Sequence, residues 1–312
     1  MNAKIFWSIL VLLPLCVCAV FARDIGQTGR FIPAEGKTYI FGGQNNADSD
    51  SFVKINKKVP YGFTIYMSLS SLDGLDKNID FGAGETSAGH ILKKYPNAAL
   101  QIGLHLVGDL QAVADGDLDG NIIKFAEWIK KAKVPVFLRI GYEFDYPSNG
   151  YEPELYVKAY QRIVDKFDGL GVKNVAYVWH SYASLNPRGI EAWYPGDEYV
   201  DWCAISYFAS PQWIPMLKFS QKRNKPLMIA ECAPVLGNDL KPEGKMNWYK
   251  KLFRFIENNN VKALCYINAD WNKQPMFAGY NWGNSRLDDT KEIKEFWLEQ
   301  MSGGRFVFIR KK

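Results

Sequence analysis

Two glutamates in this sequence each close a run of mainly apolar residues. Val134–Phe144 reads VPVFLRIGYEF and contains Glu143, and Pro226–Cys232 reads PLMIAEC and contains Glu231. A protonated carboxyl group beside an ionised carboxylate can cleave a glycosidic bond, because the acid protonates the leaving oxygen while the carboxylate attacks or stabilises the sugar cation. The plainer alternative is that each glutamate makes a salt bridge or a helix cap at a strand end.

Strand periodicity brings the two glutamates together if both runs are strands of one sheet. Alternation of side chains predicts that Arg139, Gly141 and Glu143 share one side of the first run. The same alternation groups Leu227, Ile229 and Glu231 in the second. An arginine near one carboxylate favours its charged form, whereas apolar walls raise the pKa of the other carboxyl group. The sequence therefore predicts an unequal pair, as acid catalysis requires.

Eight short apolar runs form the framework that must position this pair. Each has the length and composition of a strand buried on both faces. The predicted strands are Thr38–Gly43, Gly62–Ser68, Ala98–Val107, Pro135–Phe144, Val175–Ser181, Val200–Phe208, Pro226–Cys232 and Val261–Ala269.

Amphipathic helices are predicted between these strands and after the last of them. They are Ser51–Lys58, Ser87–Lys94, Asn121–Lys131, Glu152–Phe167, Ile214–Arg223, Lys245–Asn258 and Thr290–Met301, whereas Leu185–Glu198 reads mostly as loop. Eight strands alternating with helices over about 250 residues predict an α/β fold of the single-domain (β/α)₈ TIM-barrel type. In that fold the chemistry lies at the carboxyl ends of the strands, where both glutamates fall.

The first 22 residues have the pattern of a secretory signal peptide. A lysine is followed by an apolar run and then by small or apolar residues up to Ala22. We expect residues 1–22 to be removed, residues 23–312 to form the barrel domain, and the protein to be secreted or periplasmic. An uncleaved membrane anchor is the alternative, and no membrane span is expected after cleavage.

The composition excludes several other classes of protein. The chain of 312 residues has a formal net charge of +5 without a polybasic stripe, so no nucleic-acid partner is expected. No cofactor motif, HExxH sequence or Cys/His cluster occurs, so neither a cofactor nor a metal site is predicted. We expect a monomer whose partner is a polysaccharide or oligosaccharide substrate.

Three segments resemble the retaining glycoside hydrolases of the large barrel clan that contains cellulases and mannanases, and most closely the family 26 β-mannanases. They are RIGYE at 139–143, YPGDEYVDW at 194–202 and KPLMIAE at 225–231. The family pattern at the first segment is Arg-x-x-His-Glu, so Tyr142 stands where the family has histidine.

This resemblance implies a role for each glutamate. Glu143 would be the general acid/base and Glu231 the nucleophile of a double displacement with net retention, for which the carboxyl groups lie about 5–5.5 Å apart. Arg139 and Tyr142 are candidate substrate-binding residues beside them. The implied substrate is a β-linked polysaccharide, mannan-like or related, cleaved in endo mode.

Aromatic residues at later strand ends are further candidates for sugar contact. Tyr207 could donate its hydroxyl to Glu231, or be a buried core tyrosine. Trp271 and the nearby Trp282 could stack on sugar rings, with packing as the alternative for each.

Three polar residues complete the predicted site. His105 and His180 could contact sugar hydroxyls or orient a catalytic carboxylate, and a structural role is as reasonable for each. Asp145 could bind a sugar hydroxyl or merely solvate a loop. The remaining functional alternative is a glycan-binding barrel that keeps the cleft but lacks turnover.

Overall fold

The computed structural model describes residues 27–183, 189–208, 213–235, 237 and 242–309. The predicted signal peptide lies outside these residues. Nine strands are present in the described part: β1 Thr38–Gly43, β2 Gly62–Ser68, β3 Ala99–His105, β4 Val136–Ile140, β5 Val175–Ser181, β6 Trp202–Tyr207, β7 Leu227–Cys232, β8 Ala263–Ile267 and β9 Phe306–Val307. All eight predicted strands are confirmed, with some ends shortened.

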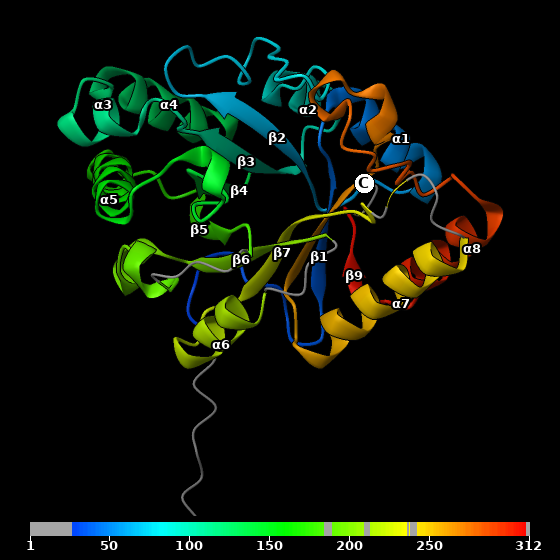
Figure 1. Cartoon of the computed structure of the whole chain (residues 1–312). Helices are drawn as coiled ribbons and strands as arrows, with labels where there is room; N and C mark the ends of the chain where they lie inside the picture. The colour runs from blue at the N-terminus through cyan, green and yellow to red at the C-terminus, as the bar shows by residue number, and fades with distance from the viewer. Residues whose placement is uncertain (1–26, 184–188, 209–212, 236, 238–241, 310–312) are drawn as a thin grey trace, which may run out of the picture.

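The strands form a closed parallel barrel. Their order is β2-β3-β4-β5-β6-β7-β8-β1, and pairing of β1 with β2 closes the ring. The short β9, which the sequence did not reveal, pairs with β1 outside the ring at Thr38–Phe306. Figure 1 shows the strands at the centre with the helices around them. The predicted single-domain TIM barrel is confirmed.

The helices lie outside the barrel in the expected alternation. They are α1 Asn46–Asn56, α2 Ala88–Lys94, α3 Leu110–Asp115, α4 Asp119–Ala132, α5 Pro153–Gly169, α6 Ile214–Lys222, α7 Pro242–Asn258 and α8 Lys291–Ser302. Short 3₁₀ helices are η1 Pro147–Asn149, η2 Glu191–Trp193, η3 Asp197–Tyr199, η4 Trp271–Lys273 and η5 Pro275–Phe277. The seven predicted helices are confirmed, and α3 is the addition. No helix in the described part is long and apolar enough to cross a membrane.

Helix α5 shows how sequence determines these elements. Pro153 occupies its first turn, where the missing N–H leaves no helical hydrogen bond unmade. Its inward residues recur at three- and four-residue spacing and are buried: Tyr156, Ala159, Tyr160, Ile163, Val164 and Phe167.

Most of the buried hydrophobic side chains form two separate sets, and a third, smaller set includes Trp271. One set lies between strands and helices, and includes Ile205 and Ile229. The other fills the lower barrel interior, where the Phe137 ring packs edge-on against Phe41 at 5.3 Å and Trp202 at 5.4 Å. Much of the aromatic content is therefore structural core.

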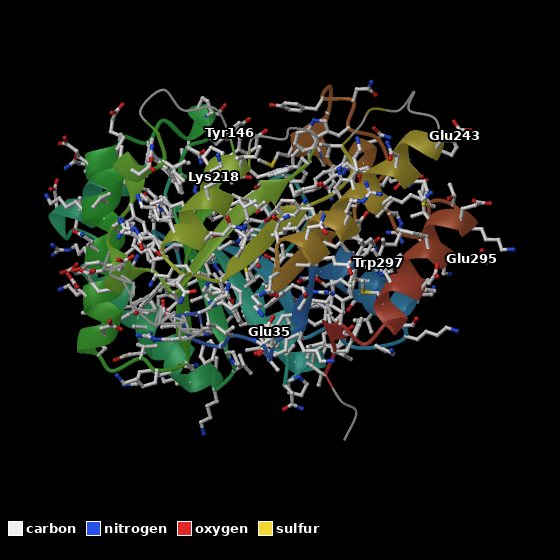
Figure 2. The ribbon with its side chains drawn as sticks, turned by 90° about the horizontal axis from the view of Figure 1, so that it is seen from below. Glu35, Tyr146, Lys218, Glu243, Glu295 and Trp297 are labelled. Atoms are coloured by element: carbon white, nitrogen blue, oxygen red, sulfur yellow. The ribbon has the colours of Figure 1, made fainter. Side chains whose placement is uncertain are left out.

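The two ends of the barrel are clearly distinguished. Figure 2 shows Tyr146, which follows β4, in the upper part of the view and Glu35, which precedes β1, in the lower part. Glu35 is the partner of Lys262 at 2.8 Å, next to the start of β8. The carboxyl ends of the strands, where TIM barrels place their chemistry, lie at the end of the barrel away from Glu35.

Candidate active site

Glu231 enters the barrel mouth because β7 contains a bulge. In the pairing of β6 with β7, Ile205 lies opposite Ile229 but Ser206 lies opposite Glu231, which leaves Ala230 as an extra residue. Strict alternation would have placed Glu231 with Ile229, which packs against the helices. The predicted grouping of Leu227, Ile229 and Glu231 on one side is therefore wrong, although the predicted meeting of the glutamates is found.

Glu143 reaches the same mouth from a loop rather than from a strand. β4 ends at Ile140, and the backbone then turns through positive φ at Gly141 (52°) and Glu143 (53°). A side chain at positive φ is strained, so the loop must hold Glu143 there. The Asn149 side chain contributes by donating to the Glu143 carbonyl at 2.9 Å. The predicted alternation of Arg139, Gly141 and Glu143 along one strand fails because the strand ends first.

Oε1 of Glu231 accepts two hydrogen bonds. Arg139, which is fully buried, donates from Nη1, and Tyr66 donates its hydroxyl at 2.7 Å. Burial, and then the negative charge of Glu231, raise the pKa of Tyr66 well above its usual range, so the phenol keeps its proton. These donors stabilise a negatively charged carboxylate.

Two tyrosine rings and a threonine hydroxyl group contact the guanidinium of Arg139. Its guanidinium lies 5.2 Å from the Tyr66 ring centroid and 5.1 Å from that of Tyr142, and its Nη2 donates to Thr64 Oγ1 at 3.2 Å. The two rings also contact each other, with centroids 5.4 Å apart, and together with Thr64 they restrict the movement of the guanidinium away from Glu231.

Glu143 has the opposite electrostatic environment. Burial raises the pKa of its carboxyl group well above the usual range, and the charge of Glu231 raises it further. The hydrogen bond from Ser206 Oγ to Oε1 and the charge of Arg139 only partly oppose this rise. Glu143 is therefore suited to hold a proton, whereas the carboxylate of Glu231 accepts hydrogen bonds from two donors.

A cavity at the barrel mouth contains both carboxyl groups. Aromatic side chains dominate its wall, with few polar groups between them. The lining residues are Gln44, Tyr66, Phe81, Ala83, Gly84, Thr86, Tyr142, Glu143, Tyr146, Tyr182, Phe208, Glu231, Trp271, Met276, Phe277, Tyr280 and Trp282. Aromatic faces beside a few hydrogen-bonding groups suit a sugar chain. Among the described residues no group of three or more His, Cys, Asp or Glu is placed to hold a metal ion.

Comparison with known proteins identifies the family. The model for glycosyl hydrolase family 26 matches residues 102–240. A "Beta-1,3-xylanase" from Alcaligenes sp is 31% identical over 327 aligned residues, which cover 94% of this chain and 69% of the relative. A "Beta-1,3-xylanase TXYA" from Vibrio sp is also 31% identical, covering 94% of this chain and 70% of the relative.

The chain belongs to glycosyl hydrolase family 26. It is therefore a glycoside hydrolase, and the resemblance of its sequence to that family is confirmed. Among solved structures, a GH26 β-mannanase from Bacteroides ovatus superposes with a TM-score of 0.63, covering 88% of this chain and 91% of that chain. At 14% identity that likeness supports the barrel fold.

Some of the predicted site residues line the cavity of this hydrolase. Tyr142, Trp271 and Trp282 line it together with the two glutamates. The Trp271 ring meets that of Trp282 edge-on at 5.2 Å, and its Nε1 donates to Ser285 Oγ at 2.7 Å. Arg139 contacts Glu231 and does not line the cavity.

Tyr207 does not donate to Glu231, so that prediction is wrong. Along β6 the side chains alternate, and Ser206 takes the inward position next to the glutamates. Tyr207 consequently points to the helices, where it packs against Trp213, Trp248 and Phe255. The hydroxyl expected from Tyr207 comes from Tyr66 instead.

The other three polar candidates lie behind the cavity wall. Asp145 is buried and accepts from Ser181 Oγ at 2.8 Å and from the Tyr182 backbone N–H at 2.6 Å, so it shapes a loop. His105 stacks on Phe81, and burial lowers its pKa. His180 is fully buried. None of the three is among the residues that line the cavity.

Sequence reasoning missed Tyr66 and much of the cavity wall. Tyr66 lies two residues after Thr64 on β2, and both side chains contact Arg139 inside the barrel. That period-two spacing was a usable signal in Gly62–Ser68. Tyr146, Tyr182 and Phe81 come from loops, where no periodicity exists to reveal them.

Proposed function

We propose that this hydrolase is a secreted endo-acting enzyme that cleaves β-1,3-linked xylan with retention of configuration. Residues 1–22 would direct export and residues 23–312 would form the catalytic domain. The observation that carries the proposal is the unequal environment of the two glutamates, in which Arg139 and Tyr66 hold Glu231 while burial favours protonated Glu143.

The mechanism follows from that inequality. Protonated Glu143 gives its proton to the glycosidic oxygen while Glu231 attacks the anomeric carbon, which forms a covalent glycosyl-enzyme. Loss of the Glu143 proton then allows this residue to act as a base for water in the second step. A raised pKa for Glu143 while Glu231 is charged supports this order, because formation of the ester removes that charge.

The substrate is proposed from three features. The curated relatives that align with 94% of this chain are named as β-1,3-xylanases. The cavity wall is largely aromatic, with Gln44 and Thr86 among its few neutral polar groups apart from the tyrosines. A pentose has one hydroxymethyl group fewer than a hexose and so needs fewer polar contacts. The Tyr142 side chain, which replaces the family histidine, also favours a substrate other than mannan.

A polysaccharide panel tests this proposal. Purified protein is incubated with β-1,3-xylan, β-1,4-xylan, β-mannan and β-glucan, and the products are separated by size. We expect β-1,3-xylan to be cleaved to a range of oligosaccharides and Glu143→Gln and Glu231→Gln to remove that activity. Preferred cleavage of mannan would overturn the substrate assignment. Binding without cleavage of any glycan would support the glycan-binding alternative.

A further inference from the structure

A chain of hydrogen bonds connects Arg139 to Glu143 through two buried residues of neighbouring strands. Arg139 Nη1 lies 3.3 Å from His180 Nδ1 on β5, and His180 Nε2 lies 3.1 Å from Ser206 Oγ on β6. Ser206 Oγ is in turn bonded to Oε1 of Glu143. His180 is fully buried and Ser206 is 2% exposed, so water does not compete for these contacts.

The chemistry of the donors fixes the direction of each contact. Arginine carries only donors, so Arg139 donates to Nδ1 and this nitrogen of His180 is unprotonated. Burial and the charge of Arg139 hold the pKa of His180 well below its usual range, so the neutral ring carries its proton on Nε2 and donates to Ser206. The single Ser206 hydrogen is then free to point only at Glu143.

We propose that His180 and Ser206 are positioning residues that direct the transferable proton of Glu143 to Oε2. The proposal rests on the catalytic role proposed for Glu143 above. Oε1 accepts the Ser206 hydrogen, and no other described residue is hydrogen-bonded to this carboxyl group. The acid proton is consequently carried by Oε2, the oxygen left for the glycosidic bond.

Proton transfer, bond cleavage and nucleophilic attack occur together in the proposed step. The Oε2 proton passes to the glycosidic oxygen while the bond from that oxygen to the anomeric carbon breaks, its electron pair remaining on the oxygen. A carboxylate oxygen of Glu231 forms the new bond to the anomeric carbon. Oε1 of Glu231 is already occupied by Arg139 and Tyr66, which leaves its Oε2 to attack. Arg139 thus orients Glu231 directly and Glu143 through His180 and Ser206.

The charged groups that act on Glu143 are few. The negative charges of Glu231 and Asp145 raise the pKa of its carboxyl group and the positive charge of Arg139 lowers it. The hydrogen-bonded residues Arg139, His180 and Ser206 are called the relay here. Because His180 is neutral, the His180–Ser206 part of the relay gives Glu143 a hydrogen bond and adds no charge. A hydrogen bond to the ionised carboxylate lowers its pKa, so removal of Ser206 should raise the pKa of Glu143.

A carboxyl titration tests the relay without any substrate. The full chain is labelled with ¹³C at glutamate side-chain carboxyl carbons, and the Glu143 signal is assigned as the one absent from Glu143→Gln. In Ser206→Ala we expect the titration midpoint to rise by about one pH unit. His180→Leu should shift it in the same direction, and the double variant should match Ser206→Ala alone. An unchanged midpoint in Ser206→Ala, or additive shifts in the double variant, would overturn the proposal.

The dependence of the rate on the leaving group tests whether Ser206 directs the Glu143 proton to the glycosidic oxygen. Phenyl and 2,4-dinitrophenyl β-glycosides of 1,3-linked xylobiose are compared, since only the phenyl leaving group needs strong acid assistance. In Ser206→Ala we expect kcat/KM to fall at least about tenfold on the phenyl substrate and less than about twofold on the dinitrophenyl one. Ser206→Thr, which keeps a hydroxyl group, should recover the phenyl activity.

Controls separate this proposal from the proposed function. Ser220→Ala removes another buried serine, whose hydroxyl bonds Leu217 O within α6, and should change neither readout. Melting curves report whether each variant folds. Equal losses on both substrates would contradict the proton-directing role. If the wild-type enzyme cleaved neither glycoside, the proposed substrate would be wrong and the titration would still decide the role of His180 and Ser206.

Discussion

Tyr66 donates its hydroxyl to Oε1 of Glu231 at 2.7 Å, on the oxygen that also accepts from Arg139. Removing this donor in Tyr66→Phe should lower kcat/KM about 10- to 100-fold, because a hydrogen bond to a charged group is lost where charge is redistributed during the reaction. Steady-state kinetics measures the effect.

Tyr207→Phe is the matched control for Tyr66→Phe. The Tyr207 ring packs among Trp213, Trp248 and Phe255, away from Glu231. Its kcat/KM should stay within about twofold of wild type, because the ring that packs there is retained. A large loss in Tyr207→Phe with none in Tyr66→Phe would refute this assignment of the hydroxyl.

The raised pKa of Glu143 makes a specific prediction about stability. A carboxyl group whose pKa rises on folding, here from an ordinary value of 4.5, contributes stability that is present below that value and is lost as the pH rises. Glu143→Gln cannot ionise, so its free energy of unfolding should exceed that of wild type by about 1 kcal/mol or more at pH 8. Denaturant unfolding at several pH values measures the difference.

The difference in unfolding free energy between Glu143→Gln and wild type should shrink toward acidic pH and change little below pH 4. Glu127→Gln, at an exposed position on α4, is the control for removing one carboxylate from the surface. If the excess stability of Glu143→Gln over wild type grew as the pH fell, the pKa of Glu143 could not be raised in the folded protein.

Gly141 gives the backbone the turn that aims Glu143. Its φ is +52°, and an added Cβ would lie 3.0 Å from the Tyr156 ring. Gly141→Ala should therefore cost about 1–2 kcal/mol of unfolding free energy and also reduce kcat. Gly120→Ala in α4, where a Cβ meets nothing within 4 Å, should stay within about 0.5 kcal/mol of wild type. Equal stabilities for the two variants would disprove the proposed strain.

Tyr280 offers an exposed ring at the edge of the cavity. It is 59% exposed, and its ring lies 5.4 Å from that of Trp282. Tyr280→Ala should raise KM for the polysaccharide about 3- to 10-fold and leave kcat nearly unchanged, because stacking holds the chain without touching the reacting bond. Tyr199→Ala, on η3 away from the cavity, is the control. A fall in kcat at constant KM would argue against a binding role.

The barrel was predictable because its strands are buried on both faces and so read as apolar runs. Glu143 and Glu231 each fall at the end of such a run, and this position predicted that both lie at the mouth of the barrel. Their side-chain directions were less accessible to sequence. The bulge at Ala230 and the positive φ of Glu143 break the period of two, and neither leaves a mark in residue type.

The partners of the glutamates were hidden for a different reason. Tyr66 and Glu231 are 165 residues apart, so their contact exists only once the barrel closes. His180 and Ser206 belong to adjacent strands, and their relation depends on register. From sequence alone, a histidine without a neighbouring motif is equally consistent with a contact to sugar and with a role in orienting a catalytic carboxylate. The second role is the one proposed for His180, because its Nε2 contacts Ser206 Oγ, which in turn bonds Glu143.

In the proposed mechanism Glu231 attacks and Glu143 supplies and then removes the proton, which requires two inversions at the anomeric carbon. Proton NMR of a β-1,3-xylo-oligosaccharide digest, recorded within the first minutes before mutarotation, identifies the anomer first released. We expect the β-anomer to appear first and the α-anomer only later, by mutarotation. Initial release of the α-anomer would mean a single displacement by water and would contradict the roles assigned to Glu231 and Glu143.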